Sequence, residues 1–65
     1  HIELVVAHYD LGVFYEKQGK FDEAIQQYQV ALKLEPSLTQ ASVNLKNIYL
    51  RKGLKNKMEF EKTSQ

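Results

Sequence analysis

The chain has 65 residues, no cysteine and a formal net charge of +1. A chain of this length holds at most one domain, and it buries only about 60% of its unfolded surface on folding. The lack of cysteine excludes disulfides and thiol catalysis, and the small net charge argues against electrostatic capture of nucleic acid or membranes by the whole chain. No apolar run approaches the roughly 20 residues of a membrane span, and no signal-peptide pattern is present, so we expect a soluble, cytoplasmic setting.

Apolar residues at helical spacing predict a first helix over residues 1–18. They fall into two stripes about half a turn apart, and a helix that is apolar on nearly all sides is normally covered on nearly all sides. We therefore expect one stripe to pack on the next helix and the other to meet a neighbour. The first stripe is Leu4, His8, Leu11 and Tyr15, and the second is Ile2, Val6, Tyr9 and Val13.

A glycine inside this predicted helix indicates a close crossing with the second helix. Gly12 costs about 1 kcal/mol relative to alanine at such a position, so we expect it to let Ala24 and Tyr28 approach its backbone. Gly19 is expected to end the helix, because glycine adopts the left-handed conformation without a Cβ penalty. Pro36 is expected to stop the second helix after Leu34, because proline removes its preceding residue from helical geometry.

The second predicted helix, from Phe21 or Asp22 to Leu34, is apolar on one side only. Its packing stripe is Phe21, Ala24, Ile25, Tyr28, Ala31 and Leu32, and its wet face carries Gln26, Gln29, Val30 and Lys33. A helix with this distribution is covered on one side and solvated on the other.

Residues 37–40 have the S-x-x-Q form of a capping box, which predicts a third helix over residues 38–52. Gly53 is expected to end it, and a short fourth helix is expected over residues 55–62. The packing stripe of the third helix is Leu38, Ala41, Leu45, Ile48 and Tyr49, and a separate row of hydrogen-bonding side chains is Asn44, Asn47 and Arg51.

The order of these residues resembles the tetratricopeptide repeat, whose unit is a 34-residue helical hairpin. Counted from Val5, the repeat runs to Leu38, and only His8 departs from the pattern. A second register from Thr39 keeps Leu45, Tyr49 and Gly53 but is partial, because Lys46, Met58 and Lys62 occupy slots for small or aromatic residues. The matching positions of the first repeat are Leu11, Gly12, Tyr15, Gly19, Phe21, Ala24, Tyr28, Ala31 and Pro36.

The resemblance implies an all-α fold of antiparallel helix-turn-helix hairpins, stacked as a short right-handed α-solenoid fragment. Residues 1–65 are then one fragment, with a full repeat at 5–38 and a partial repeat or capping helices at 39–65. The implied function is a protein-interaction scaffold that binds a peptide or partner helix in the groove lined by the first helix of each repeat. The groove positions are Val6, Tyr9, Val13, Lys17, Val43, Asn44, Asn47 and Arg51.

One subgroup of this family clamps a terminal carboxylate with a lysine and an asparagine on its first repeat. This chain has Tyr9 and Val13 at those two positions, and only Asn44 matches, on the second repeat. We therefore expect no such clamp.

No residue pattern indicates catalysis, a metal or a cofactor, so we expect a protein that is not an enzyme. His1 and His8 are seven residues apart, which is poor spacing for joint metal binding on a helix. The eight carboxylates lack the apolar surroundings and partner base of a tuned acid, and the three glycines are isolated instead of forming a phosphate loop.

Two alternative functions come from other features of the chain. Apolar residues that no hairpin stripe covers favour a self-assembly unit, because contiguous exposed apolar surface usually finds a partner. These residues are Ile2, Val6, Phe14, Val43 and Leu50. An RNA-contacting module is favoured less: residues 51–62 hold five Lys or Arg against two Glu, led by Arg51, Lys52, Lys55 and Lys57.

Overall fold

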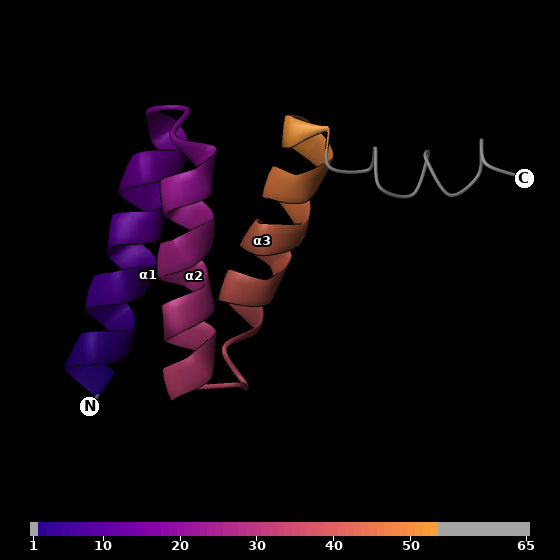
Figure 1. Cartoon of the computed structure of the whole chain (residues 1–65). Coiled ribbons are helices and arrows are strands. Elements are labelled where there is room, and N and C mark those ends of the chain that lie inside the picture. Colours follow the sequence, from indigo (N-terminus) through magenta and orange to yellow (C-terminus); the bar gives the residue numbers. More distant parts are fainter. Residues whose placement is uncertain (1, 54–65) are drawn as a thin grey trace, which may run out of the picture.

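Three helices make up residues 2–53, the part of the chain that the computed structural model describes. They are α1 (Ile2–Lys17), α2 (Phe21–Leu34) and α3 (Thr39–Lys52). Figure 1 shows them as a row of antiparallel neighbours with α2 between α1 and α3, and α2 packs on both. No strand occurs in this range, which confirms the all-α hairpin fold. The fourth helix predicted over residues 55–62 lies outside the described residues.

The turn between α1 and α2 closes the first helix with a Schellman motif. Gly19 has φ 78°, the Gly19 N–H donates to the Glu16 carbonyl at 3.0 Å, and the Lys20 N–H donates to the Tyr15 carbonyl at 2.9 Å. The left-handed conformation that these two bonds require is open to glycine without strain. Gly19 therefore ends α1 as predicted, and the chain reverses within three residues.

The start of α3 corrects the predicted capping box. The helix begins at Thr39, its N-cap is Leu38, and no side chain caps it. Ser37, which was expected to cap, instead donates its hydroxyl to the Glu35 carboxylate. Glu35 itself has φ −142° and ψ 89°, an extended geometry of the kind favoured before a proline. Its carboxylate accepts the serine hydroxyl that was expected to cap the helix.

The core is built mainly from α2 and α3. Its fully buried side chains are Ala24, Tyr28 and Ala31 of α2 and Ala41 and Ile48 of α3. All five belong to the packing stripes predicted for these two helices, and the other members of both stripes are half-buried. The wet face predicted for α2 is also confirmed, with only Val30 half-buried on it.

The packing face of α1 differs from both predicted stripes. Leu4 and Leu11 of the first stripe and Ile2 and Val6 of the second are exposed. The buried residue of this helix is Gly12, which lies between the two stripes. Because glycine has no side chain, it does not register in an apolar pattern, although the tightest approach of α2 centres on it.

The Tyr28 ring occupies the space that a side chain at position 12 would need. A Cβ placed on Gly12 would lie 2.7 Å from Tyr28 Cε1 and 2.8 Å from Cδ1. Real Cβ atoms essentially never approach carbon atoms this closely, and the fully buried ring has no room to move aside. The predicted contact between Gly12 and Tyr28 is therefore confirmed.

We predict that Gly12→Leu and Ala24→Leu each lower the free energy of unfolding by about 1 to 3 kcal/mol, because the crossing has no room for added methylenes. Chemical denaturation measures this change. Gln26→Ala on the exposed side of α2 serves as the control and is expected to change the value by less than about 0.5 kcal/mol. Leu variants that unfold at the parent midpoint would show that the crossing is not tightly packed.

Candidate partner-binding groove

One asparagine of α3 links all three helices through hydrogen bonds. Asn44 Nδ2 donates to the hydroxyl of Tyr9 on α1 and to the hydroxyl of Tyr28 on α2, each at 3.1 Å. The two tyrosine rings lie against each other with centroids 5.5 Å apart and planes tilted by 47°. Side chains of α1 and α3 therefore meet directly across α2, as expected for helices that line a common surface.

A buried proton donor continues this network to α1. The Tyr28 hydroxyl donates to Glu16 Oε1 at 2.8 Å while it accepts from Asn44. Burial, reinforced by the neighbouring Glu16 carboxylate, raises the pKa of the Tyr28 hydroxyl far above its ordinary value. The hydroxyl therefore stays protonated into the alkaline range, and it donates to Glu16 throughout.

Tyr9 and Val13, two of the predicted groove positions, are not freely exposed. Both pack against the core cluster and are half-buried. Asn44, a third predicted groove position, has no amide hydrogen left for a ligand, because its amide nitrogen carries two hydrogens and both already bind tyrosine hydroxyls. These three residues fix the shape of the surface on which the other predicted groove positions stand.

The remaining groove positions are exposed. Val6 and Val43 are 49% and 48% exposed, so α1 and α3 each contribute one exposed apolar side chain to the predicted groove positions. Lys17, Asn47 and Arg51 are also exposed and carry the donors on this surface. The arrangement combines two apolar contact points with an amide and two cations, which suits a peptide that has both apolar side chains and carbonyl or carboxylate groups.

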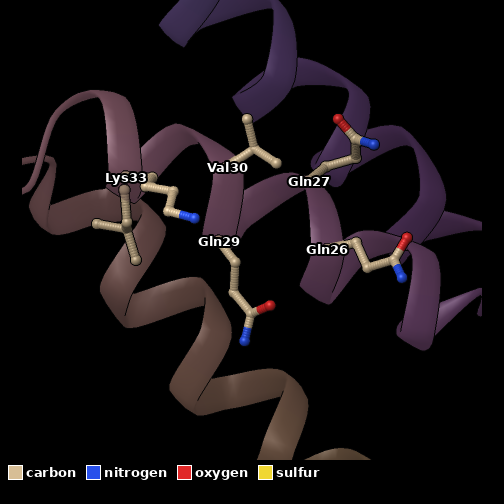
Figure 2. Close-up of a pocket in the computed structure, with 6 residues that line it drawn as sticks. Gln26, Gln27, Gln29, Val30 and Lys33 are labelled. Carbon is tan, nitrogen blue, oxygen red and sulfur yellow. The ribbon is translucent and has the colours of Figure 1, made fainter.

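The outer side of α2 carries a shallow depression, shown in Figure 2. It is formed by residues of this single helix, and the labelled side chains in the figure all rise from it. A surface formed by one helix with mostly flexible polar side chains has few fixed contacts to offer a ligand. The residues that form it are Gln26, Gln27, Gln29, Val30, Leu32 and Lys33.

His8, the departure from the repeat pattern, has a packing role. Its Nδ1 lies 2.7 Å from Oε1 of Gln27, so the half-buried imidazole is tied to α2. The apolar pattern placed His8 in the first stripe of this helix but did not predict its partner, because the two residues are 19 positions apart along the chain.

Within residues 2–53, no group of three or more His, Asp or Glu side chains is arranged to hold a metal ion. No helix in this range is long and apolar enough to cross a membrane. Of the basic residues considered for RNA contact, Lys52 pairs with Asp22 at 3.1 Å, which joins the end of α3 to the start of α2. Lys55 and Lys57 lie outside the described residues.

The sequence model of the tetratricopeptide repeat matches residues 5–38, which is 34 of the 65 residues and more than half of the chain. The chain belongs to the tetratricopeptide repeat family. Comparison with curated proteins and with solved structures found no match. The matched repeat contains α2 and nearly all of α1, including the crossing of Gly12 and Tyr28. Tetratricopeptide repeats are generally non-catalytic, protein-interaction scaffold modules.

We predict that Tyr28→Phe lowers the unfolding free energy by about 1 to 2 kcal/mol near neutral pH, because Glu16 and Asn44 each lose a partner.

The raised pKa of the Tyr28 hydroxyl leads to a second prediction, on the pH dependence of stability. The stability from the protonated hydroxyl is fully present below about pH 10, and it falls by at most about 1.4 kcal/mol per pH unit above that value, where only the unfolded chain loses the proton. Urea unfolding at pH 8 to 11 measures both effects. Equal slopes for parent and variant would contradict the assignment.

A second prediction separates the two asparagines of α3. Asn44→Ala is expected to cost about 1 to 2 kcal/mol of unfolding free energy, because two tyrosine hydroxyls lose their shared donor. Asn47→Ala, the same change at an exposed position one turn away, is expected to cost less than about 0.5 kcal/mol. Hydrogen exchange of α3 amides provides the measurement. Equal protection in both variants would show that Asn44 does not hold α3 on the hairpin.

Proposed function

We propose that this chain is a scaffold module that binds a peptide or a partner helix across the surface shared by α1 and α3. The supporting observation is the direct contact between Tyr9 of α1 and Asn44 of α3, which joins these two helices into one surface. The proposed groove consists of Tyr9 and Asn44, of Tyr28 beneath them, and of the exposed side chains around them. In this proposal, residues 39–65 belong to a partial second repeat or to capping helices.

The proposed contacts divide between two kinds of residue. Val6 and Val43 provide apolar contact, and desolvation of such side chains supplies most of the affinity at small interfaces. Asn47 and Arg51 donate hydrogen bonds to backbone carbonyls or to a carboxylate of an extended or helical segment. Lys17 adds a positive charge at the C-terminal end of α1. The preferred partner is therefore a segment with apolar side chains and at least one acidic group.

The preorganised floor of this surface favours binding. Tyr9, Tyr28 and Asn44 are held by mutual hydrogen bonds and ring contact, so they lose little freedom when a partner is bound. An unsupported surface of long side chains pays about 0.5 to 1.5 kcal/mol for each side chain that binding immobilises. On the outer side of α2, Gln27 is bonded to His8, but Gln26, Gln29 and Lys33 are long exposed side chains whose immobilisation would cost entropy.

Binding is tested with a peptide selected against the whole chain from a random 12-residue library. Arg51→Ala is expected to weaken binding of that peptide by about 1 to 3 kcal/mol, because arginine is among the commonest energetic anchors of interfaces. Its matched control is Lys33→Ala, which removes the same charge from the outer face of α2 and is expected to leave the affinity unchanged. Calorimetry gives the affinities, and thermal unfolding checks that both variants keep the parent stability.

Tyr9→Ala is unsuitable as a binding test, because Tyr9 packs on the core and its loss is expected to lower stability as well as affinity. Val43→Ser is the better apolar variant, since Val43 is exposed. If Lys33→Ala abolishes capture of the selected peptide while Arg51→Ala and Val43→Ser do not, the partner binds the outer side and the proposed groove is wrong.

A further inference from the structure

Exposed apolar surface is concentrated on α1. Of the eight large apolar side chains that are exposed in the described part of the chain, five belong to this helix. α1 stands at one end of the row of helices and packs mainly on α2, so much of its circumference has no neighbour among residues 2–53 (Figure 1). The five residues are Ile2, Leu4, Val6, Leu11 and Phe14.

Helical geometry divides these residues between two faces. At 100° per residue, Val6 and Ile2 lie on the groove side with Tyr9, whereas Leu4, Leu11 and Phe14 lie on the side turned away from α3. Ala7, which is also exposed, falls between Leu4 and Leu11 on this second face. We call the set of Leu4, Ala7, Leu11 and Phe14 the outer α1 face. It is separate from the proposed groove.

The spacing of the outer α1 face is that of a helix-pairing seam. Positions 4, 7, 11 and 14 alternate steps of three and four, which is the spacing of the a and d positions of a coiled coil. Small Ala7 lies beside large Leu4 and Leu11, so the face has a central hollow between bulky ends. Such a face is complementary to an antiparallel copy of itself, because the hollow of each helix then receives a leucine of the other.

Charges along one flank of this face select the same orientation. Glu3, Asp10 and Lys17 recur every seven residues, and all three are exposed. In an antiparallel pair related by a two-fold axis, this flank of one helix lies against the same flank of the other helix. Glu3 of one chain then lies opposite Lys17 of the other, twice, and the helix dipoles also oppose favourably. The other flank holds His8 and Tyr15, which are half-buried on the intrachain side.

We propose that the outer α1 face binds a second copy of this chain, with the two α1 helices antiparallel and related by a two-fold axis. Leu4 lies against Phe14 of the second copy, and Ala7 lies against Leu11. Asp10 lies opposite its own counterpart at the axis, where the two carboxylates repel. Apart from Lys17, which lies opposite Glu3 of the second copy, the groove of each chain stays open, so the dimer presents two grooves that run in opposite directions.

The size of the seam sets the expected affinity. A 16-residue helix is about 24 Å long, and a seam of this length falls below the roughly 1,200 Å² of buried surface that marks stable complexes. The dimer is therefore a weak one, with a dissociation constant in the range of about 10 µM to 1 mM. Sedimentation equilibrium of the whole chain across this range is the first test. A monomer at every concentration would overturn the proposal and leave the face to some other helix.

Substitutions in the seam distinguish this dimer from non-specific association. Ala7→Glu is expected to raise the dissociation constant at least about 10-fold, because it places two like charges in the apolar seam. Gln26→Glu, an equal change on the exposed side of α2, is its control and is expected to have no effect. Both positions are exposed in the single chain, so circular dichroism should show unchanged helix content. Equal loss of dimer in the two variants would overturn the proposal.

The axial carboxylates provide a gain-of-binding test. Asp10→Asn removes the repulsion at the two-fold axis and is expected to lower the dissociation constant about 3-fold, an effect typical of exposed charge pairs. Glu23→Gln removes the same charge from the start of α2 and is expected to leave the dissociation constant unchanged. A parallel pair does not bring the two Asp10 residues together, so an unchanged value for Asp10→Asn would overturn the antiparallel arrangement.

Disulfide trapping tests the same arrangement by distance, since the chain has no cysteine of its own. Asp10→Cys is expected to form a covalent dimer rapidly under mild oxidation, because the two introduced thiols meet at the axis. Lys17→Cys is expected to remain unlinked, since its counterpart lies about 21 Å away along an antiparallel pair. Faster linking of Lys17→Cys than of Asp10→Cys would contradict the model of the dimer. None of these variants alters a groove residue other than Lys17, so peptide binding by Ala7→Glu tests the proposed function independently.

Discussion

The contact between Gly12 and the Tyr28 ring is the constraint on which the arrangement of all three helices depends. The ring fills the space of the missing side chain on α1, so the backbone of that helix lies close to α2. At this depth the Tyr28 hydroxyl reaches both Glu16 and Asn44. One side chain therefore determines how closely α1 approaches and where α3 is held.

The same contact determines which polar groups remain for a partner. Tyr28 and Tyr9 occupy both amide hydrogens of Asn44, so this asparagine supports the groove from within. The donors that face solvent are those of Lys17, Asn47 and Arg51, at the edges of the surface. A rigid polar floor with exposed donors at its margin suits recognition of a segment laid across the helices, because little ordering is left to the moment of binding.

The fold was largely predictable from the sequence because α2 and α3 each have one apolar stripe, and their stripes are buried as expected. The packing face of α1 was predicted only in part: the glycine itself indicated the crossing at Gly12, but the two apolar stripes did not show that this residue is the centre of the face. Ser37 was predicted to cap α3, but the nearby Glu35 carboxylate takes its hydroxyl. The core role of Tyr9 depends on contacts with Asn44, 35 residues away, which spacing along one helix does not encode.

The sequence separation of the contacts between helices also indicates the order in which parts of the chain fold. His8 and Gln27 are 19 residues apart and share a hairpin, whereas Tyr9 and Asn44 are separated by 35 residues. Closing the shorter loop costs less chain entropy, and the tight turn at Gly19 brings α1 and α2 together early. The contact between Tyr28 of α2 and Asn44 of α3 spans only 16 residues. We therefore expect both neighbouring helix pairs to form before α1 and α3 meet, so that among residues 2–53 the surface shared by α1 and α3 is completed last.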